Sequence, residues 1–102
     1  MPRAVDPRFG RKMRSVRQMR GMTQVEVAEK ADVGHTYISR IENGHAPPPS
    51  TETIVRIADA LDADADELLA LAGKVAPDVE QMLIERPSLM DVVRKEAEAV
   101  PA

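Results

Sequence analysis

The chain has 102 residues, which suffice for one small domain with an extension, and its formal net charge at pH 7 is −3. It contains no cysteine, which excludes a disulfide framework, a thiolate metal site and a cysteine nucleophile, and suits a reducing cytoplasm. No apolar run is long enough to cross a bilayer and the N-terminus lacks the apolar core of a signal peptide, so we expect neither membrane insertion nor secretion.

The charges are distributed unevenly. Residues 1–44 hold nine Lys/Arg against five Asp/Glu, whereas residues 45–102 hold five against twelve. A basic first half permits a surface that attracts nucleic-acid phosphate with a steep dependence on salt. A run of charge is more often only a solvated face, so this pattern does not decide the function by itself.

Residues 1–8 contain two prolines and show no helical periodicity, which is typical of a flexible arm. The side chains of Arg3 and Arg8 could reach a minor groove or phosphates, but an unstructured tail is the favoured explanation.

The first predicted helix spans residues 9–20. Its inward side is apolar, with Phe9, Met13 and Val16 at helical spacing. Arg11, Lys12 and Arg14 lie on the outward side, Arg17 falls beside the apolar stripe, and Gly21 is a typical helix-terminating glycine.

Two short helices with a tight break between them are predicted over residues 23–42. Thr23 and Glu26 form a capping box that marks the start of the first helix. The small side chains of Ala28 and Ala31 allow a second helix to cross closely. This spacing indicates a helix-turn-helix.

The second of these helices has two different faces. Ile38 and Ile41 point one way, while the opposite face carries His35, Thr36, Ser39 and Arg40. Such a helix can bury its isoleucines and place hydrogen-bonding side chains in the major groove of DNA, where base edges are recognised by these groups.

Two further helices are predicted before residue 73. Ser50 or Thr51 caps the first, whose core positions are Ile54, Ile57, Ala58 and Leu61. Asp64 and Glu67 form a second capping box, and the helix that follows ends at Gly73.

Residues 74–102 are predicted to form two short amphipathic helices. Pro77 suits the first turn of one, Pro87 interrupts it, and Ser88 caps the other. Their exposed apolar candidates are Val79, Met82, Leu83, Ile84, Leu89, Met90, Val92 and Val93. Because more than one face is apolar, the pattern favours a contact with a second copy or another protein, with packing against the chain's own domain as the alternative.

Taken together, these positions resemble the Cro/cI-type helix-turn-helix regulators, also called XRE-type. The matching residues are Phe9, Gly10, Met13, Arg14, Val16, Arg17, Gly21 to Gln24, Val27, Ala28, Ala31, Val33, Tyr37 to Ser39, Ile41 to Gly44, Pro49, Ser50, Thr53, Ile57, Ala58, Ala60, Leu61 and Glu67 to Leu69. Asp32 and Gly34 stand where the family often has Gly and Ser, but Asp tolerates a left-handed backbone and Gly is an acceptable cap.

The resemblance implies an all-α fold. A five-helix Cro/cI-repressor-like domain would occupy residues 9–73, between the arm of residues 1–8 and a C-terminal extension of two short helices over residues 74–102. It also implies a partly buried ion pair between Arg17 and Glu42, which would join the first and third helices.

The same resemblance implies roles for the surface residues. His35, Thr36, Ser39 and Arg40 would contact base edges, with Arg40 recognising a guanine. The residues that would contact the DNA backbone or brace the recognition helix are Thr23, Gln24, Tyr37, Asn43, His45 and Arg14.

The expected function is a sequence-specific DNA-binding transcriptional regulator, a repressor that binds an inverted-repeat operator in double-stranded DNA as a homodimer. It would act in the prokaryotic cytoplasm, at the nucleoid when bound. The alternative is a protein-interaction module, such as an antitoxin that also represses its own promoter, with the second protein at the C-terminal extension. The outer face of residues 35–40 favours DNA because it has no aromatic or aliphatic anchor.

An enzymatic function is not expected. His35 and His45 are the only histidines and lack the spacing of a zinc site, so we expect no metal and no cofactor. Paired carboxylates such as Asp64 and Asp66 are explained by their place at a helix start, where they stabilise the free amides.

Overall fold

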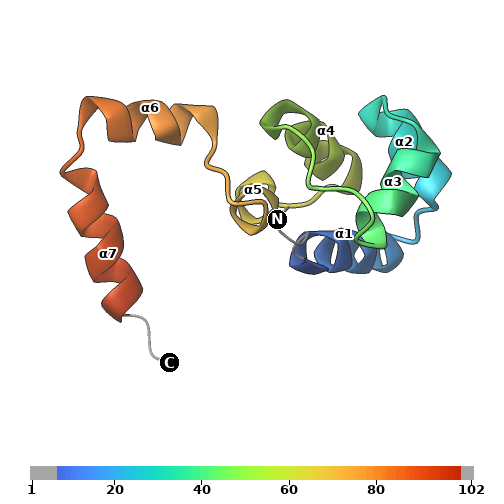
Figure 1. The fold of residues 1–102 in the computed structure, drawn as a ribbon, viewed down its shortest axis with the longest axis horizontal. Coiled ribbons are helices and arrows are strands. Elements are labelled where there is room, and N and C mark those ends of the chain that lie inside the picture. Colours follow the sequence, from blue (N-terminus) through green and yellow to red (C-terminus); the bar gives the residue numbers. More distant parts are fainter. Residues whose placement is uncertain (1–6, 100–102) are drawn as a thin grey trace, which may run out of the picture.

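The structure, a computed structural model, describes residues 7–99 of the chain, and within them every regular element is a helix (Figure 1). The helices are α1 (Pro7–Met19), α2 (Gln24–Ala31), α3 (His35–Glu42), α4 (Thr51–Leu61), α5 (Ala65–Leu71), α6 (Pro77–Glu85) and α7 (Leu89–Ala99). The predicted all-α class, with five helices followed by an extension of two, is confirmed.

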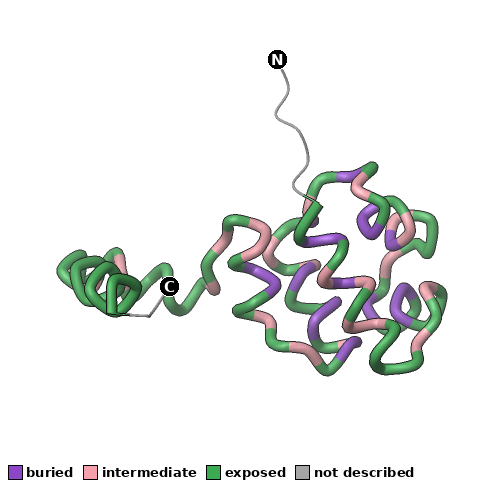
Figure 2. The backbone as a smooth tube through the Cα atoms, turned by 90° about the horizontal axis from the view of Figure 1, so that it is seen from below, coloured by how far each residue is buried: buried purple, intermediate pink, exposed green. Residues whose placement is uncertain are grey.

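Helices α1 to α5 form one body around a single apolar core. Helix α2 packs against α3 and α4, α1 packs against α3 and α5, and α4 packs against α5. The fully buried side chains come from every one of these helices: Phe9, Met13, Val27, Ile38, Ile41, Ile54, Ile57, Leu61, Leu68 and Leu69. Figure 2 shows that the buried residues are confined to this body. The apolar stripes predicted from helical spacing are therefore the core.

Helix α1 begins earlier than predicted. Its first residue is Pro7, where a missing N–H and a fixed φ suit a helix start. Arg8 consequently belongs to the helix and not to an arm. The rest of the predicted arm, including Arg3, lies outside the described residues.

Two helices end on an aspartate in the left-handed conformation. Asp32 ends α2 with φ 57° and Asp62 ends α4 with φ 51°. In both cases the next residue donates its N–H to a carbonyl five residues earlier, at 2.9 Å from Val33 and 2.8 Å from Ala63. This bond satisfies a carbonyl that the helix leaves free, and it confirms that Asp is tolerated at the break between α2 and α3.

The predicted caps are mostly confirmed. The Thr23 hydroxyl accepts from the N–H of Glu26 at 3.1 Å, and the Glu26 carboxylate accepts from the N–H of Thr23 at 3.0 Å. Ser50 caps α4, accepting from the Thr53 N–H at 3.3 Å. The second capping box is wrong: Asp64 caps α5, but the Glu67 carboxylate pairs with Lys12 of α1 at 3.0 Å.

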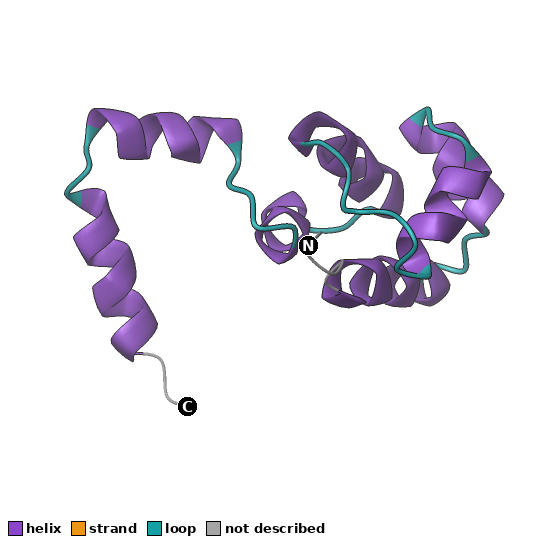
Figure 3. Cartoon of the chain, viewed as in Figure 1, coloured by secondary structure: helices purple, strands orange, loops and turns teal. Residues whose placement is uncertain are grey.

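Helices α6 and α7 project from the body as an arm, linked to α5 and to each other by short loops (Figure 3). Neither helix contains a buried residue. The radius of gyration is 15.2 Å, larger than the about 13 Å of a compact domain of roughly 100 residues. The extension therefore does not fold back on its own domain.

Candidate nucleic-acid interface

Helix α3 is buried on one side and open on the other. Ile38 and Ile41 are 0% and 2% exposed and belong to the core. His35, Thr36 and Arg40 are exposed, and Ser39 is half-buried. The row that was predicted to contact base edges thus lies on the surface of the body.

The start of α3 presents free backbone donors. Gly34 is the N-cap residue, with φ −73° and ψ 142°, and supplies no side-chain hydrogen bond. Its carbonyl accepts from the N–H groups of Tyr37 and Ile38, so the first amides of the helix remain available. Such amides, together with the helix dipole, attract an anion such as phosphate.

A buried carboxylate joins α3 to the two helices beneath it. The Glu42 side chain is fully buried and accepts two bonds from the Arg17 guanidinium of α1, from Nε at 2.7 Å and from Nη2 at 2.9 Å. Gln24, the first residue of α2, donates to the same carboxylate at 3.1 Å. Arg14 of α1 adds a longer contact at 3.4 Å. The structure thus brings Arg17 and Glu42 together, and adds two donors.

These contacts set the charge of the Glu42 carboxyl. Burial raises its pKa, but the hydrogen bonds from Arg17 and Gln24 and the positive charge of Arg17 lower it by more, so the pKa lies below its usual value. The bond to Glu42 in turn raises the pKa of Arg17. Both groups are therefore charged at neutral pH, which a buried pair needs if it is to hold the helices together.

A second chain of hydrogen bonds runs along the edge of α3. The Arg14 guanidinium donates to the side-chain carbonyl of Asn43, and the Asn43 amide donates to the Ser39 hydroxyl at 3.4 Å. This arrangement fixes Arg14 and Asn43 beside the exposed row. Both were predicted to contact the DNA backbone or to brace the recognition helix.

The other residues of that group have different surroundings. Thr23 uses its hydroxyl in the capping box, and the Gln24 amide bonds Glu42, so both brace the start of α2. Tyr37 is half-buried and packs against the core. His45 is exposed in the loop after α3.

Arg40 has a partner that the sequence did not indicate. Its Nη2 donates to the backbone carbonyl of His45 at 3.0 Å, across the turn that ends α3. The bond is exposed, and a protein or DNA acceptor can replace it at little cost. Spacing alone gave no signal of this contact, because it depends on how the loop turns back.

Sequence reasoning also missed the reason for Gly10. A Cβ atom at this position would lie 2.3 Å from the carbonyl oxygen of Ile41 and 3.1 Å from that of Glu42. Helices α1 and α3 therefore cross with their backbones nearly touching. A glycine inside a helix, where alanine is intrinsically preferred, was the available signal.

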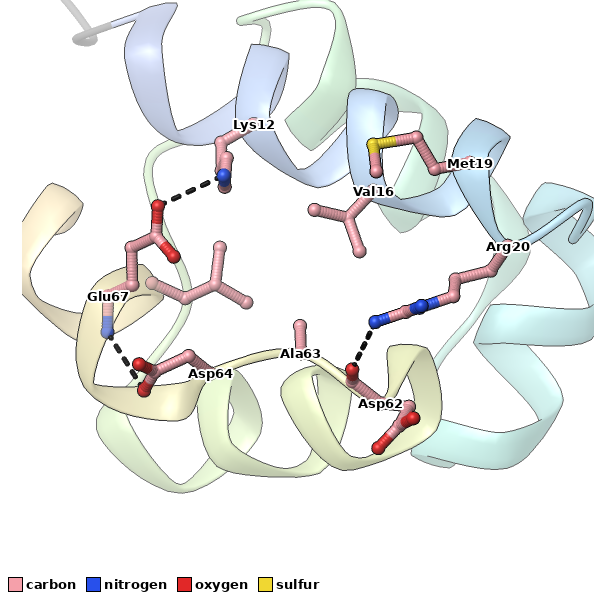
Figure 4. Close-up of a pocket in the computed structure, with 9 residues that line it drawn as sticks. Lys12, Val16, Met19, Arg20, Asp62, Ala63, Asp64 and Glu67 are labelled. Carbon is pink, nitrogen blue, oxygen red and sulfur yellow. Dashed lines mark hydrogen bonds and ion pairs between the residues drawn. The ribbon is translucent and has the colours of Figure 1, made fainter.

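A shallow pocket lies between α1 and the start of α5 and includes no residue of α3 (Figure 4). Its basic side chains already have partners: Lys12 pairs with Glu67 at 3.0 Å, and Arg20 donates to the backbone carbonyls of Leu61 and Asp62 at 3.0 and 2.8 Å. These contacts join α1 to α4 and α5. The side chains that line the pocket therefore have a structural role.

Residues 7–99 show neither a metal-binding cluster nor a membrane-spanning helix. No three His, Cys, Asp or Glu side chains in this part of the chain lie close enough to hold a metal ion together. Within the same range no helix has the length and apolar character that crossing a membrane requires.

Comparison with known proteins shows which family the chain resembles. The profile described as helix-turn-helix domain matches residues 8–71. The HTH-type transcriptional repressor RghR of Bacillus subtilis is 36% identical over 67 residues, which are 66% of this chain and 50% of that protein. This chain spans about half the length of the curated relatives it matches, between 47% and 50%.

Solved structures show the same fold. The biofilm regulator SinR, crystallised in complex with DNA, has a TM-score of 0.56 and 31% identity, and the match covers 60% of this chain and 97% of that one. The clp gene regulator ClgR of Corynebacterium glutamicum has a TM-score of 0.58 and 25% identity over 94% of both chains. A match of that extent reaches beyond the five-helix body into the arm.

Proposed function

Since this chain belongs to the Cro/cI-type family of helix-turn-helix regulators, we propose that it is a sequence-specific DNA-binding transcriptional regulator with α3 as its recognition helix. The observation that carries the proposal is the exposed polar row of α3. Its isoleucines and Glu42 are fixed in the body, while His35, Thr36 and Arg40 are open to a ligand. A rigid helix with hydrogen-bonding groups on its outer side suits the major groove.

The residues divide by the part of DNA that each would contact. Base edges would be contacted by His35, Thr36, Ser39 and Arg40. For Arg40, guanine O6 and N7 would replace the carbonyl of His45 as acceptors. Phosphates would lie against Arg14, Asn43 and His45 and against the free amides at the start of α3. Thr23, Gln24 and Tyr37 would brace the recognition helix.

The protein would act as a homodimer on an inverted repeat. A twofold axis would place two α3 helices in successive major grooves about 34 Å apart. Occupation of such a site near a promoter would repress transcription, as the name of the relative RghR states for that protein. The protein would work in the cytoplasm, bound to the nucleoid.

A second protein at the extension is the competing proposal. The exposed apolar side chains of α6 and α7 would suit an antitoxin that holds a toxin there. The polar row of α3 offers no such anchor, so DNA binding would remain with the body in either case.

Selection of bound duplexes from a random pool, with the full chain as bait, tests the proposal. We expect an enriched inverted repeat whose half-sites lie one or more helical turns apart. The control is the double variant His35→Ala with Thr36→Ala, which changes two exposed side chains and should keep the fold but lose the enrichment. Equal enrichment by both proteins, or none by the wild type, would refute α3 as the recognition helix.

A further inference from the structure

Ser39 lies in the polar row of α3, and the residue that ends this helix bonds its hydroxyl. Ser39 follows His35 by four residues and Thr36 by three, so the three side chains share one face of α3. Its hydroxyl accepts from the side-chain amide of Asn43 at 3.4 Å. A serine hydroxyl has one O–H donor and two lone pairs, and it rotates to suit its partners. The groups around Ser39 therefore decide whether it donates to a ligand or accepts from one.

The orientation of the Asn43 amide is set by Arg14. The Arg14 guanidinium donates from Nη2 to the side-chain carbonyl of Asn43, and its Nε contacts the buried Glu42 carboxylate at 3.4 Å. A guanidinium has donors only and remains charged. Asn43 must therefore turn its carbonyl oxygen toward Arg14, which leaves its NH2 group facing Ser39. The opposite orientation of the amide would place N–H groups against N–H groups.

The Asn43 amide in turn limits what the Ser39 hydroxyl can do. Its NH2 group occupies one lone pair of the hydroxyl, and the hydroxyl hydrogen cannot point at that donor. Among residues 7–99 no side chain and no backbone carbonyl accepts the Ser39 O–H. A donor that an interface encloses without an acceptor loses its hydration with no compensation. A ligand that covers this face of α3 must therefore present an acceptor to Ser39.

We infer that Ser39 acts as a donor in DNA recognition, that Asn43 and Arg14 are the positioning residues that make it one, and that the base nearest Ser39 is guanine or thymine. In the major groove guanine presents N7 and O6 and thymine presents O4, all acceptors, whereas cytosine presents the N4–H2 donor. Adenine presents one group of each kind. The inference rests on the proposed function, since it places α3 in the major groove.

A change from amide to carboxylate at Asn43 should reverse the base preference. In Asn43→Asp one carboxylate oxygen accepts from Arg14 and the other accepts the Ser39 O–H, so that only lone pairs of Ser39 face the DNA. Selection of duplexes from a random pool, with the full chain as bait, should then replace guanine or thymine by cytosine or adenine at one position of each half-site. Ser39→Ala identifies this position, because the preference there disappears.

Competition between duplexes that differ only at this position measures the effect. The wild type should prefer guanine or thymine over cytosine about five- to tenfold, and Asn43→Asp should prefer cytosine by a similar factor. The new charge also weakens binding to every duplex, but this effect cancels in the ratio of two affinities. The matched control is Asn43→Asp combined with Ser39→Ala, which carries the same charge without the hydroxyl and should show no preference.

Two variants of Arg14 test the same hydrogen bonds without a new carboxylate. Arg14→Lys keeps a side chain that only donates, so the preference should persist even where the overall affinity falls. Arg14→Met allows the Asn43 amide to turn either way and should bring the ratio of affinities close to one. Arg11→Met removes a charge from an exposed site on the same helix and should leave the ratio unchanged.

Three results would overturn the inference: a wild-type preference for cytosine, an Asn43→Asp variant with the wild-type preference, or a double variant that behaves like Asn43→Asp alone. If Asn43→Asp does not fold, equal ratios for Arg14→Lys and Arg14→Met would overturn it instead. Failure of the proposed function gives a different pattern. In that case the wild type enriches no sequence, whereas an enriched inverted repeat with no position that depends on Ser39 refutes only the inference.

Discussion

Arg40 and Glu42 lie two residues apart on α3 and differ in their surroundings. Arg40 is exposed and bonds a backbone carbonyl in the next loop, whereas Glu42 is buried under bonds from Arg17 and Gln24. A change at the first position should affect recognition, while a change at the second should affect folding. The two residues thus give separate tests of the site and of its support.

Replacement of Arg40 by alanine should weaken binding to the selected duplex by about 1 to 3 kcal/mol and relax the preference at one base pair. Fluorescence anisotropy with the selected and a random duplex measures both effects. Arg56→Ala, which removes an exposed cation from α4, is the control and should leave the ratio of the two affinities unchanged. If Arg40→Ala weakens both duplexes equally, Arg40 contacts a phosphate.

Glu42→Gln should make the stability of the body less dependent on pH. Because the pKa of Glu42 is lowered in the folded state, the ion pair stabilises the fold fully above the unfolded pKa of about 4.3, and this contribution is lost as pH falls through the folded pKa. Removing the charge leaves Arg17 poorly paired, at a cost of about 3 kcal/mol at pH 7.

Urea unfolding of both proteins from pH 7 to pH 3 measures the effect. The difference in the free energy of unfolding should be large at pH 7 and shrink at the acid end. Glu29→Gln on the exposed side of α2 serves as the control and should show little difference at any pH. A difference between Glu42→Gln and wild type that stays constant over the range would mean that folding does not lower the pKa of Glu42.

The helices themselves were predictable because each has a period and an end signal. Spacing of 3.6 residues identified the buried side of α1 to α5, and Thr23, Ser50 and Asp64 marked three starts. The features that the sequence did not predict are contacts between helices. The Glu67 pair with Lys12 and the Gln24 bond to Glu42 join elements far apart in the chain, and no local pattern specifies which polar groups will meet.

The close crossing of α1 and α3 can be tested by adding a methyl group at Gly10. Gly10→Ala should destabilise the body by about 1 to 3 kcal/mol, because the new methyl group would meet the Ile41 carbonyl and force the helices apart. Helix propensity alone predicts the opposite sign, a gain of about 1 kcal/mol. Thermal unfolding followed by circular dichroism distinguishes the two.

Ser15→Ala is the matched control for this crossing, since Ser15 is exposed on the same helix. It should change the midpoint of unfolding only slightly. A Gly10→Ala protein as stable as the control would show that the two backbones can separate without loss, and that Gly10 is not required by packing.

The molecule as a whole consists of a packed body and an arm without buried residues. The five-helix body followed from periodicity and family resemblance. The position of the arm did not, because an amphipathic helix specifies that one side is covered without specifying by what. The position of the arm could therefore be learned only from the structure.

Truncation after Ala76 should remove the arm with little effect on the body. Ala76 still packs against the core, while none of the deleted described residues is buried. We expect the free energy of unfolding at low concentration to change by less than about 1 kcal/mol. Affinity for a single half-site should persist, while cooperative binding to the full inverted repeat should be lost.

Sedimentation velocity and titrations of one-site and two-site duplexes measure these effects. If the truncated chain unfolds in buffer, the arm is needed for folding of the body. If it binds the full repeat as cooperatively as the intact chain, the two copies meet through another surface.

Helices α1 and α2 both bond the Glu42 carboxylate of α3, so changes at this junction should destabilise the whole body. A screen for alleles that abolish regulation would return changes at Glu42, Arg17 and Gly10 alongside those in the exposed row of α3, although none of these three needs to touch an operator. Such alleles would be recessive and would lower the amount of protein in the cell. Alleles of the exposed row would accumulate normally and, by forming mixed dimers with wild-type subunits, would be dominant.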